Sequence, residues 1–220
     1  MSLSPVHPEF HVFAERGLLY PPLSVVLVET TPSSYPEALF LYMIHKRLEL
    51  NEEDLFVASL LEDFETTLQA SVIPSPLVLK FRDLLRNPRV HYRFFETVED
   101  LMKAVELHYK NIYFMYIYTS SLTGSKDLVE MLTNFVRKVK STLSRTFNLT
   151  VFIDSENLAN AAGRRLEYLA DIIFEVKEAT EMGNVSIIYV KRTKLYPKPD
   201  IVVEYSLSRE EVVLQVIRSI

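Results

Sequence analysis

The sequence predicts an α/β domain with a mostly parallel, helix-flanked sheet and an antiparallel strand extension at its C-terminal end. Two observations predict this fold class. From Val25 to Leu169, short β-branched or aromatic runs alternate with segments of helical hydrophobic period, as in a parallel sheet whose connections are helices. After Leu169, strand-like runs follow one another with little helix between them. The 220 residues are 48% hydrophobic and 24% charged, which suits one globular domain.

Apolar runs rich in β-branched and aromatic residues predict the strands. In chain order these are Val25–Val28, Asp54–Ser59, Val90–Phe95, Asn111–Tyr118, Leu149–Ile153, Asp171–Val176, Val185–Lys191, Ile201–Tyr205 and Val212–Ile217. Helical periodicity predicts helices at 38–48, 61–70, Lys80–Arg86, Thr97–His108, Lys126–Arg145 and Asn157–Leu169. Two of these helices have the spacing of a capping box at their start, namely Ser34 with Glu37 and Thr97 with Asp100.

The sequence predicts an arm followed by one domain, and its composition excludes several kinds of chemistry. Residues 1–22 contain four prolines without a clear period and are predicted to form an N-terminal arm, while 23–220 form a single domain. The absence of cysteine excludes disulfides, thiol chemistry and sulfur-ligated zinc, and it suits a cytoplasmic protein. No apolar stretch reaches the ~20 residues of a membrane span. We expect no metal, no cofactor and no membrane partner.

Several segments of the sequence together resemble the RecA/KaiC-like ATPase core. VVLVETTPSSYPEALFLYMI is similar to that family's first strand, phosphate-binding loop and helix, with Pro32 where many KaiC-like loops have a proline. DLFVASLLEDFETTL resembles the strand that ends in two carboxylates, and IYFMYIYTSSL occupies the place of the Walker B strand. The family's closing strands are resembled by AGRRLEYLADIIFEVKE, VSIIYVKRTKL and DIVVEYSLSREEVVL. The resemblance covers roughly Leu23 to Val216 and implies a RecA-like twisted sheet.

The sequence departs from the family's G-x-x-x-x-G-K-[ST] loop. In the register set by Pro32, the loop positions are held by Thr30, Ser33, Ser34, Tyr35, Pro36 and Glu37. Tyr35 replaces a glycine, Pro36 replaces the lysine that contacts phosphate, and Glu37 places a negative charge where Ser or Thr is expected. Tyr118 occupies the position of the aspartate that directs Mg²⁺, and tyrosine is a poor Mg²⁺ ligand. We therefore expect no ATP hydrolysis.

Three acidic residues are candidates for residual ligand contact. Glu62 and Asp63 approximately match the family's catalytic carboxylates, which orient the attacking water. The alternative is that they are ordinary acids at the start of a helix. Asp154 follows a buried strand, at the sheet edge where open α/β sheets bind ligands, but it also suits a helix cap.

Two groups of basic residues are candidates for contact with a partner. Lys191, Arg192 and Lys194 follow a strand in the region where KaiC-like proteins carry the cation that reaches a neighbouring subunit's phosphates. A possible nucleic-acid track comprises Arg137, Lys138, Lys140, Arg145, Arg164 and Arg165. For both groups the alternative is a solvated cluster of charges with no partner.

These observations predict a non-catalytic RecA/KaiC-like protein that acts as an assembly or regulatory subunit. Its expected partner is a second copy of itself or a RecA/KaiC-like ATPase paralogue, to which it could donate a Lys or Arg in trans. One alternative is a nucleic-acid-binding accessory factor of recombination or RNA processing. Another is an enzyme that uses a different cofactor in the remodelled loop.

Overall fold

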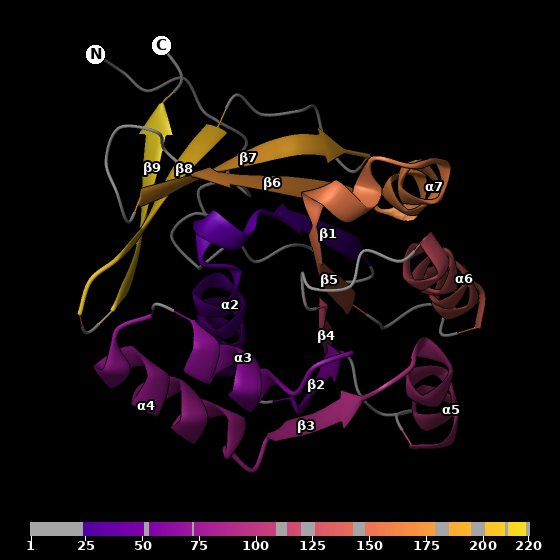
Figure 1. The fold of residues 1–220 in the computed structure, drawn as a ribbon, viewed down its shortest axis with the longest axis horizontal. Coiled ribbons are helices and arrows are strands. Elements are labelled where there is room, and N and C mark those ends of the chain that lie inside the picture. The colour runs from indigo at the N-terminus through magenta and orange to yellow at the C-terminus, as the bar shows by residue number, and fades with distance from the viewer. Residues whose placement is uncertain are drawn as a thin grey trace.

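The protein is a two-sided α/β domain, seen here in a computed structural model that describes residues 24–50, 53–71, 73–108, 114–119, 126–142, 148–178, 185–194, 201–209 and 211–218 (Figure 1). The strands are β1 (Val25–Thr30), β2 (Leu55–Leu60), β3 (Val90–Phe95), β4 (Phe114–Thr119), β5 (Asn148–Asp154), β6 (Ile172–Glu178), β7 (Val185–Thr193), β8 (Ile201–Leu207) and β9 (Val212–Arg218). The α-helices are α2 (Pro36–Leu50), α3 (Phe64–Ala70), α4 (Ser75–Leu85), α5 (Val98–His108), α6 (Lys126–Thr142) and α7 (Ala161–Leu169), and two 3₁₀ turns are η1 (Pro32–Ser34) and η2 (Ser155–Leu158).

The described strands form one sheet in the order β3-β2-β4-β5-β1-β6-β7-β8-β9. Pairing is parallel from β3 to β6 and antiparallel from β6 to β9. The helices that connect the parallel strands make that pairing possible, because a parallel partner requires a long crossover. The predicted fold class, a mostly parallel sheet with a C-terminal antiparallel extension, is confirmed.

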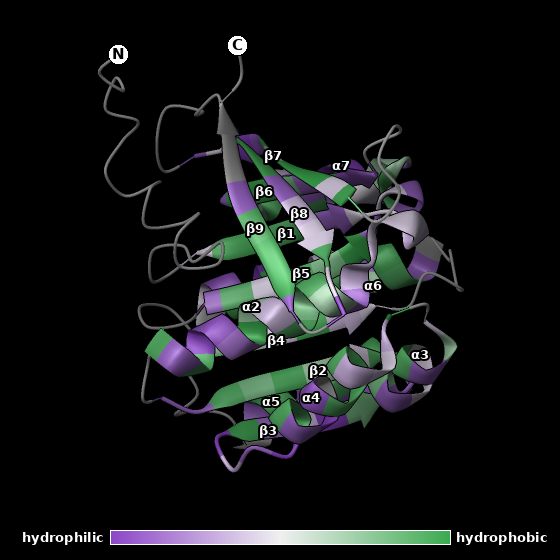
Figure 2. Cartoon of the chain, turned by 90° about the vertical axis from the view of Figure 1, so that its left-hand side faces the viewer, coloured by the Kyte–Doolittle hydropathy of each residue, from purple (hydrophilic) through white to green (hydrophobic). Residues whose placement is uncertain are grey.

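Helices cover both faces of the parallel part of the sheet (Figure 1). One hydrophobic core lies beneath α2, α3 and α4, and a second lies beneath α5, α6 and α7. Strands β2, β4 and β5 are buried along their whole length, which explains why they are continuous apolar runs, coloured green for β2 in Figure 2. The predicted stripe of α6 is buried in the second core, including Leu128, Leu132, Phe135 and Val139.

The loop between β1 and α2 corrects the capping box that was predicted for the first helix. Ser34 does not form a capping box with Glu37. It forms reciprocal bonds with Thr31 instead: its hydroxyl donates to the Thr31 carbonyl (2.7 Å) and accepts from the Thr31 amide (3.2 Å). These bonds close η1, and α2 begins at Pro36, two residues before the predicted range 38–48. The Thr97–Asp100 box is confirmed, since the Asp100 amide donates to the Thr97 hydroxyl (3.2 Å).

Three other predicted helices have different bounds. The helix predicted at 61–70 begins at Phe64, because the side chain of Asp63 caps it there. The helix predicted at Asn157–Leu169 is split into η2 and α7, because the side chain of Asn160 accepts from the Gly163 amide (2.9 Å) and starts a new helix there. The helix predicted at Lys80–Arg86 begins earlier, at Ser75, because a proline in the first turn does not disturb it.

Some predictions fall outside the described part of the chain. The N-terminal arm at 1–22 lies there, as does Arg145 of the proposed nucleic-acid track. Within the described residues, no helix combines the length and apolarity needed to cross a bilayer.

Candidate functional site

The candidate site lies at the edge of the sheet where β1, β2, β4 and β5 end. Thr30 of β1 pairs with Asp154 of β5, so the loops that follow these two strands start side by side. The described non-glycine residues with positive φ are Tyr35 (φ 51°) and Leu61 (φ 72°), and each lies in a loop that follows one of these strands. Such conformations cost of order 1–3 kcal/mol and cluster at functional sites, so they single out this edge.

Tyr35 holds the turn between η1 and α2 through its main chain. Its carbonyl accepts the amide of Ala38 (3.1 Å), as the residue before a helix does. The same carbonyl accepts the hydroxyl of Tyr205 from β8 (2.9 Å). Burial raises the pKa of Tyr205 well above its ordinary value, so it remains a donor. Strand β8 of the antiparallel extension therefore holds the loop after β1 in place through this hydrogen bond.

A hydrogen bond joins the first turn of α2 to the end of β4. The Tyr118 hydroxyl donates to Glu37 Oε1 at 2.8 Å. Burial raises the pKa of the Glu37 carboxyl, and the bond from Tyr118 opposes that rise. Burial, together with the charge of Glu37 and the bond to it, raises the pKa of Tyr118 well above its usual value. Tyr118 therefore stays protonated and donates at every physiological pH.

An aromatic cluster fixes the position of Tyr118. Its ring packs edge-on against Phe40 of α2 (centroids 5.3 Å apart) and Phe64 of α3 (4.9 Å). Phe152 of β5 lies beside it, with centroids 6.5 Å apart. Tyr118 is only 4% exposed. Aromatic pairs of this kind add about 0.5–1.5 kcal/mol beyond burial, so moving the Tyr118 ring out of this place is costly.

Asp63 caps α3 and is held by a tyrosine that the sequence did not single out. Its side chain accepts the amide of Glu65 (3.1 Å) and the hydroxyl of Tyr92 from β3 (2.6 Å). Tyr92 also bonds the Ser59 hydroxyl (2.8 Å), and burial and the bond to Asp63 raise its pKa. Glu62 lies at the same edge, since its charge acts on Tyr118 and Glu37. A single tyrosine on an edge strand carries no sequence signal for such a role.

Asp154 caps the turn after β5. Its side chain accepts the amide of Glu156 (2.9 Å), and the residue is 6% exposed. Asn157, in the same turn, is also buried, and its Nδ2 has no hydrogen-bond partner among the described residues. The capping role of Asp154 accounts for its position without a ligand.

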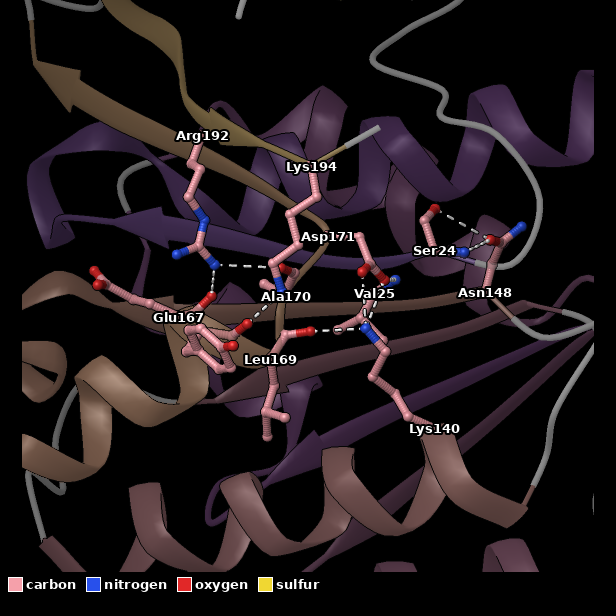
Figure 3. A network of polar contacts seen from close by, with 11 residues as sticks. Ser24, Val25, Lys140, Asn148, Glu167, Leu169, Ala170, Asp171, Arg192 and Lys194 are labelled. Carbon is pink, nitrogen blue, oxygen red and sulfur yellow. Dashed lines mark hydrogen bonds and ion pairs between the residues drawn. The ribbon is translucent and has the colours of Figure 1, made fainter. Parts of the chain in front are cut away.

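Lys191, Arg192 and Lys194 all contact the C-terminal end of α7, as Figure 3 shows for Arg192 and Lys194. Arg192 donates to the carbonyls of Glu167 and Ala170 (the latter at 3.3 Å), and Lys194 donates to the carbonyl of Tyr168.

Lys140 of α6 approaches the same helix end from the other side and donates to the Leu169 carbonyl at 2.9 Å. Four consecutive carbonyls at the negative end of α7 are thus neutralised by cations, which is a favourable arrangement for a helix C-terminus.

The proposed nucleic-acid track is only partly available as a surface. Lys138 is paired with Glu106, and Lys140 with Asp171 (2.8 Å). Arg137 donates to the Asn134 side chain (2.9 Å). Arg164 and Arg165 are exposed on α7, which packs against α6 through contacts such as the Thr133 hydroxyl with the Ala162 carbonyl (3.4 Å).

Comparison with solved structures defines the class of fold. The crystal structure of the flagellar accessory protein FlaH from Methanocaldococcus jannaschii is similar with a TM-score of 0.64 and 10% identity, over 94% of this chain and 96% of that one. A second solved structure, that of an ATPase domain, is similar with a TM-score of 0.60 and 12% identity, over 87% of this chain and 84% of that one. The fold is therefore RecA-like. No protein-family model and no curated protein matches the sequence.

Proposed function

We propose that this chain is a RecA-like protein that does not hydrolyse ATP and acts as an assembly or regulatory subunit. The observation that carries the proposal is the 2.8 Å bond from Tyr118 to Glu37. In the register of the sequence, these two residues replace the loop Ser/Thr and the strand aspartate that hold Mg²⁺ in P-loop enzymes. Here they bind each other, so the contact that a metal ion mediates in an ATPase is made directly.

The electrostatics of the edge also favour this proposal. A triphosphate in the loop after β1 would lie beside Glu37, with Glu62 near enough to act on the same carboxyl. Two like charges about 4 Å apart repel by ~4 kcal/mol at an effective dielectric of 20. Pro36 offers neither an amide donor nor a positive charge. At the two positions that hold Mg²⁺ in P-loop enzymes, a glutamate and a tyrosine bonded to each other take the place of the Ser/Thr and the aspartate, which argues against Mg²⁺–ATP in this loop.

The loop is, in addition, ordered by the protein itself. Tyr205 binds the Tyr35 carbonyl, and Ser34 and Thr31 close η1. A phosphate-binding loop is normally completed by the anion that its amides surround. A loop completed by protein side chains keeps its shape with no nucleotide. It can therefore serve as a permanent contact surface.

The resemblance to RecA/KaiC-like proteins implies association through this edge, and the test is the mass in solution. Light scattering of the purified chain should show a self-associated species, or a complex with a RecA-like ATPase of the same source. Glu62→Lys reverses a partly exposed charge at the edge and should weaken that association. Asp83→Lys reverses an exposed charge on α4, near the amino ends of the strands, and should not. A monomer at every concentration, with no effect on the ATPase, would overturn the proposal.

We also propose that the chain donates a cation in trans to a partner ATPase. A test of this must separate donation from the contacts that Arg192 makes with α7. Arg192→Ala should abolish any stimulation of a partner ATPase, but it also removes two bonds to the end of α7. Lys140→Met is the matched control, because it loosens the same helix end from α6. Stimulation lost in both variants would indicate a structural effect, and stimulation lost only in Arg192→Ala would support donation.

A further inference from the structure

A buried carboxylate on β1 shares a lysine with the end of α7. Glu29 is 2% exposed and lies on the sheet face that α6 and α7 cover, together with Val25 and Leu27. Lys191 of β7 extends across β6, and its Nζ lies 2.8 Å from Glu29 Oε2 and 2.7 Å from Glu167 Oε1. One ammonium group thus joins β1, β7 and α7.

The charges of this cluster do not balance. Two carboxylates face one ammonium, and Glu29 Oε1 is buried with no hydrogen-bond partner among the described residues. A buried acceptor without a partner is unfavourable, and an uncompensated buried charge carries a still larger free-energy cost. A proton on Glu29 removes both costs, because the carboxylic acid is neutral and can donate to Glu167.

The surrounding groups leave that imbalance in place. Arg192 on β7 acts on Glu167 but is bonded to the carbonyls of α7. Glu175 on β6 pairs in register with Glu29 and is itself bound to Lys177 (3.1 Å). On the other side of Glu29, β5 contributes the uncharged Ile153. The negative end of the α7 dipole adds to the unfavourable potential.

We propose that Glu29, Glu167 and Lys191 form a proton-dependent latch that holds the last turn of α7 against β1 and β7 while Glu29 is protonated. The latch loosens when Glu29 loses its proton, because two carboxylates then share one ammonium and one negative charge beneath the helix end is not neutralised. Since α7 follows the turn capped by Asp154, the latch makes the position of α7 beside the candidate site depend on pH. This inference does not depend on the proposed function.

The direction of the pH effect follows from the pKa values. Burial raises the pKa of Glu29 from 4.5 to about 7, against the opposing effect of Lys191. Burial alone would also raise the pKa of Glu167, but the bonds to Lys191 and Glu29 hold it below its usual value. A raised folded-state pKa means that the stabilisation is complete below pH 4.5 and is lost as pH rises through about 7.

Hydrogen exchange of the full chain tests the latch. After correction for intrinsic rates, opening of α7 should increase about thirtyfold between roughly pH 5.5 and pH 8, the change that linkage gives for a shift of this size. Glu29→Gln, which is neutral at every pH, should abolish that increase and keep α7 protected at high pH. Glu175→Gln, a carboxylate on the same sheet face, should leave the increase unchanged.

Two results would overturn the inference. One is a parent protein whose α7 protection does not depend on pH, and the other is an unchanged pH dependence in Glu29→Gln. If the glutamine variant does not fold, the carboxyl of Glu29 can be titrated by carbon NMR in the parent protein. A midpoint near 7 would support the latch, and a midpoint near the ordinary 4.5 would reject it.

Discussion

Tyr118→Phe isolates the bond at the centre of the candidate site, since it removes one hydroxyl and keeps the ring. The phenylalanine ring retains the edge-on contacts to Phe40 and Phe64, so packing is conserved. What is lost is a 2.8 Å hydrogen bond to the Glu37 carboxylate. Hydrogen bonds to charged groups contribute about 1.5–3 kcal/mol. Because Glu37 is only partly buried and water can replace part of the bond, we expect the lower half of that range.

The same variant has a predicted pH dependence. Burial raises the pKa of Glu37, and the Tyr118 bond limits that rise. Without the hydroxyl, the folded-state pKa moves further up, so the variant loses more stability than the parent as pH increases. The difference in unfolding free energy should therefore be larger near pH 8 than near pH 4, where the protonated carboxyl binds the phenol more weakly.

Urea denaturation followed by circular dichroism measures the effect. With a slope of about 2–3 kcal/mol per M, a loss of about 2 kcal/mol lowers the midpoint by somewhat less than 1 M. Tyr189→Phe is the control, because its hydroxyl forms no hydrogen bond within the described residues, and it should change stability by less than about 0.5 kcal/mol. Equal stability of Tyr118→Phe and the parent at about pH 8 would refute the role given to this bond.

Two further predictions concern α7. Arg192→Met should destabilise the isolated protein by about 1.5–3 kcal/mol in the same denaturation assay. The reason is that it removes charged hydrogen bonds to the carbonyls of Glu167 and Ala170. An unchanged midpoint would show that these bonds contribute nothing to stability. Gly163→Ala should lower the free energy of unfolding by about 3 kcal/mol or more, or prevent folding, because its Cβ would lie 2.3 Å from the Leu158 carbonyl oxygen. A variant that unfolds at the same temperature as the parent protein would contradict that close approach.

Local patterns in the sequence were sufficient for most of the fold. The strand predicted at Val90–Phe95 has those bounds in the structure, and the Thr97–Asp100 box starts α5 as expected. The capping box of the first helix was wrongly assigned because Ser34 lies three residues from both Thr31 and Glu37, so the same segment offers two capping boxes. In the structure the earlier box, between Thr31 and Ser34, closes η1, and Pro36 occupies the first position of α2.

The candidate site was only partly predictable. The sequence aligned Glu37 with the Ser/Thr of the phosphate-binding loop and Tyr118 with the aspartate that directs Mg²⁺. It did not show that the two side chains bond to each other, because they lie far apart in the chain. No periodicity indicates that Tyr92 holds Asp63 or that Tyr205 holds the Tyr35 carbonyl. The contacts of Arg192 and Lys194 with α7 likewise depend on the antiparallel pairing of β6 with β7. Such pairings are fixed by the tertiary fold.

Calorimetric titration of the purified chain with ATP and Mg²⁺ tests the central claim most directly. The structure predicts no binding at about 1 mM nucleotide, because the first turn of α2 presents a carboxylate bound to Tyr118. Saturable one-to-one uptake that requires Mg²⁺ would contradict this account of the loop.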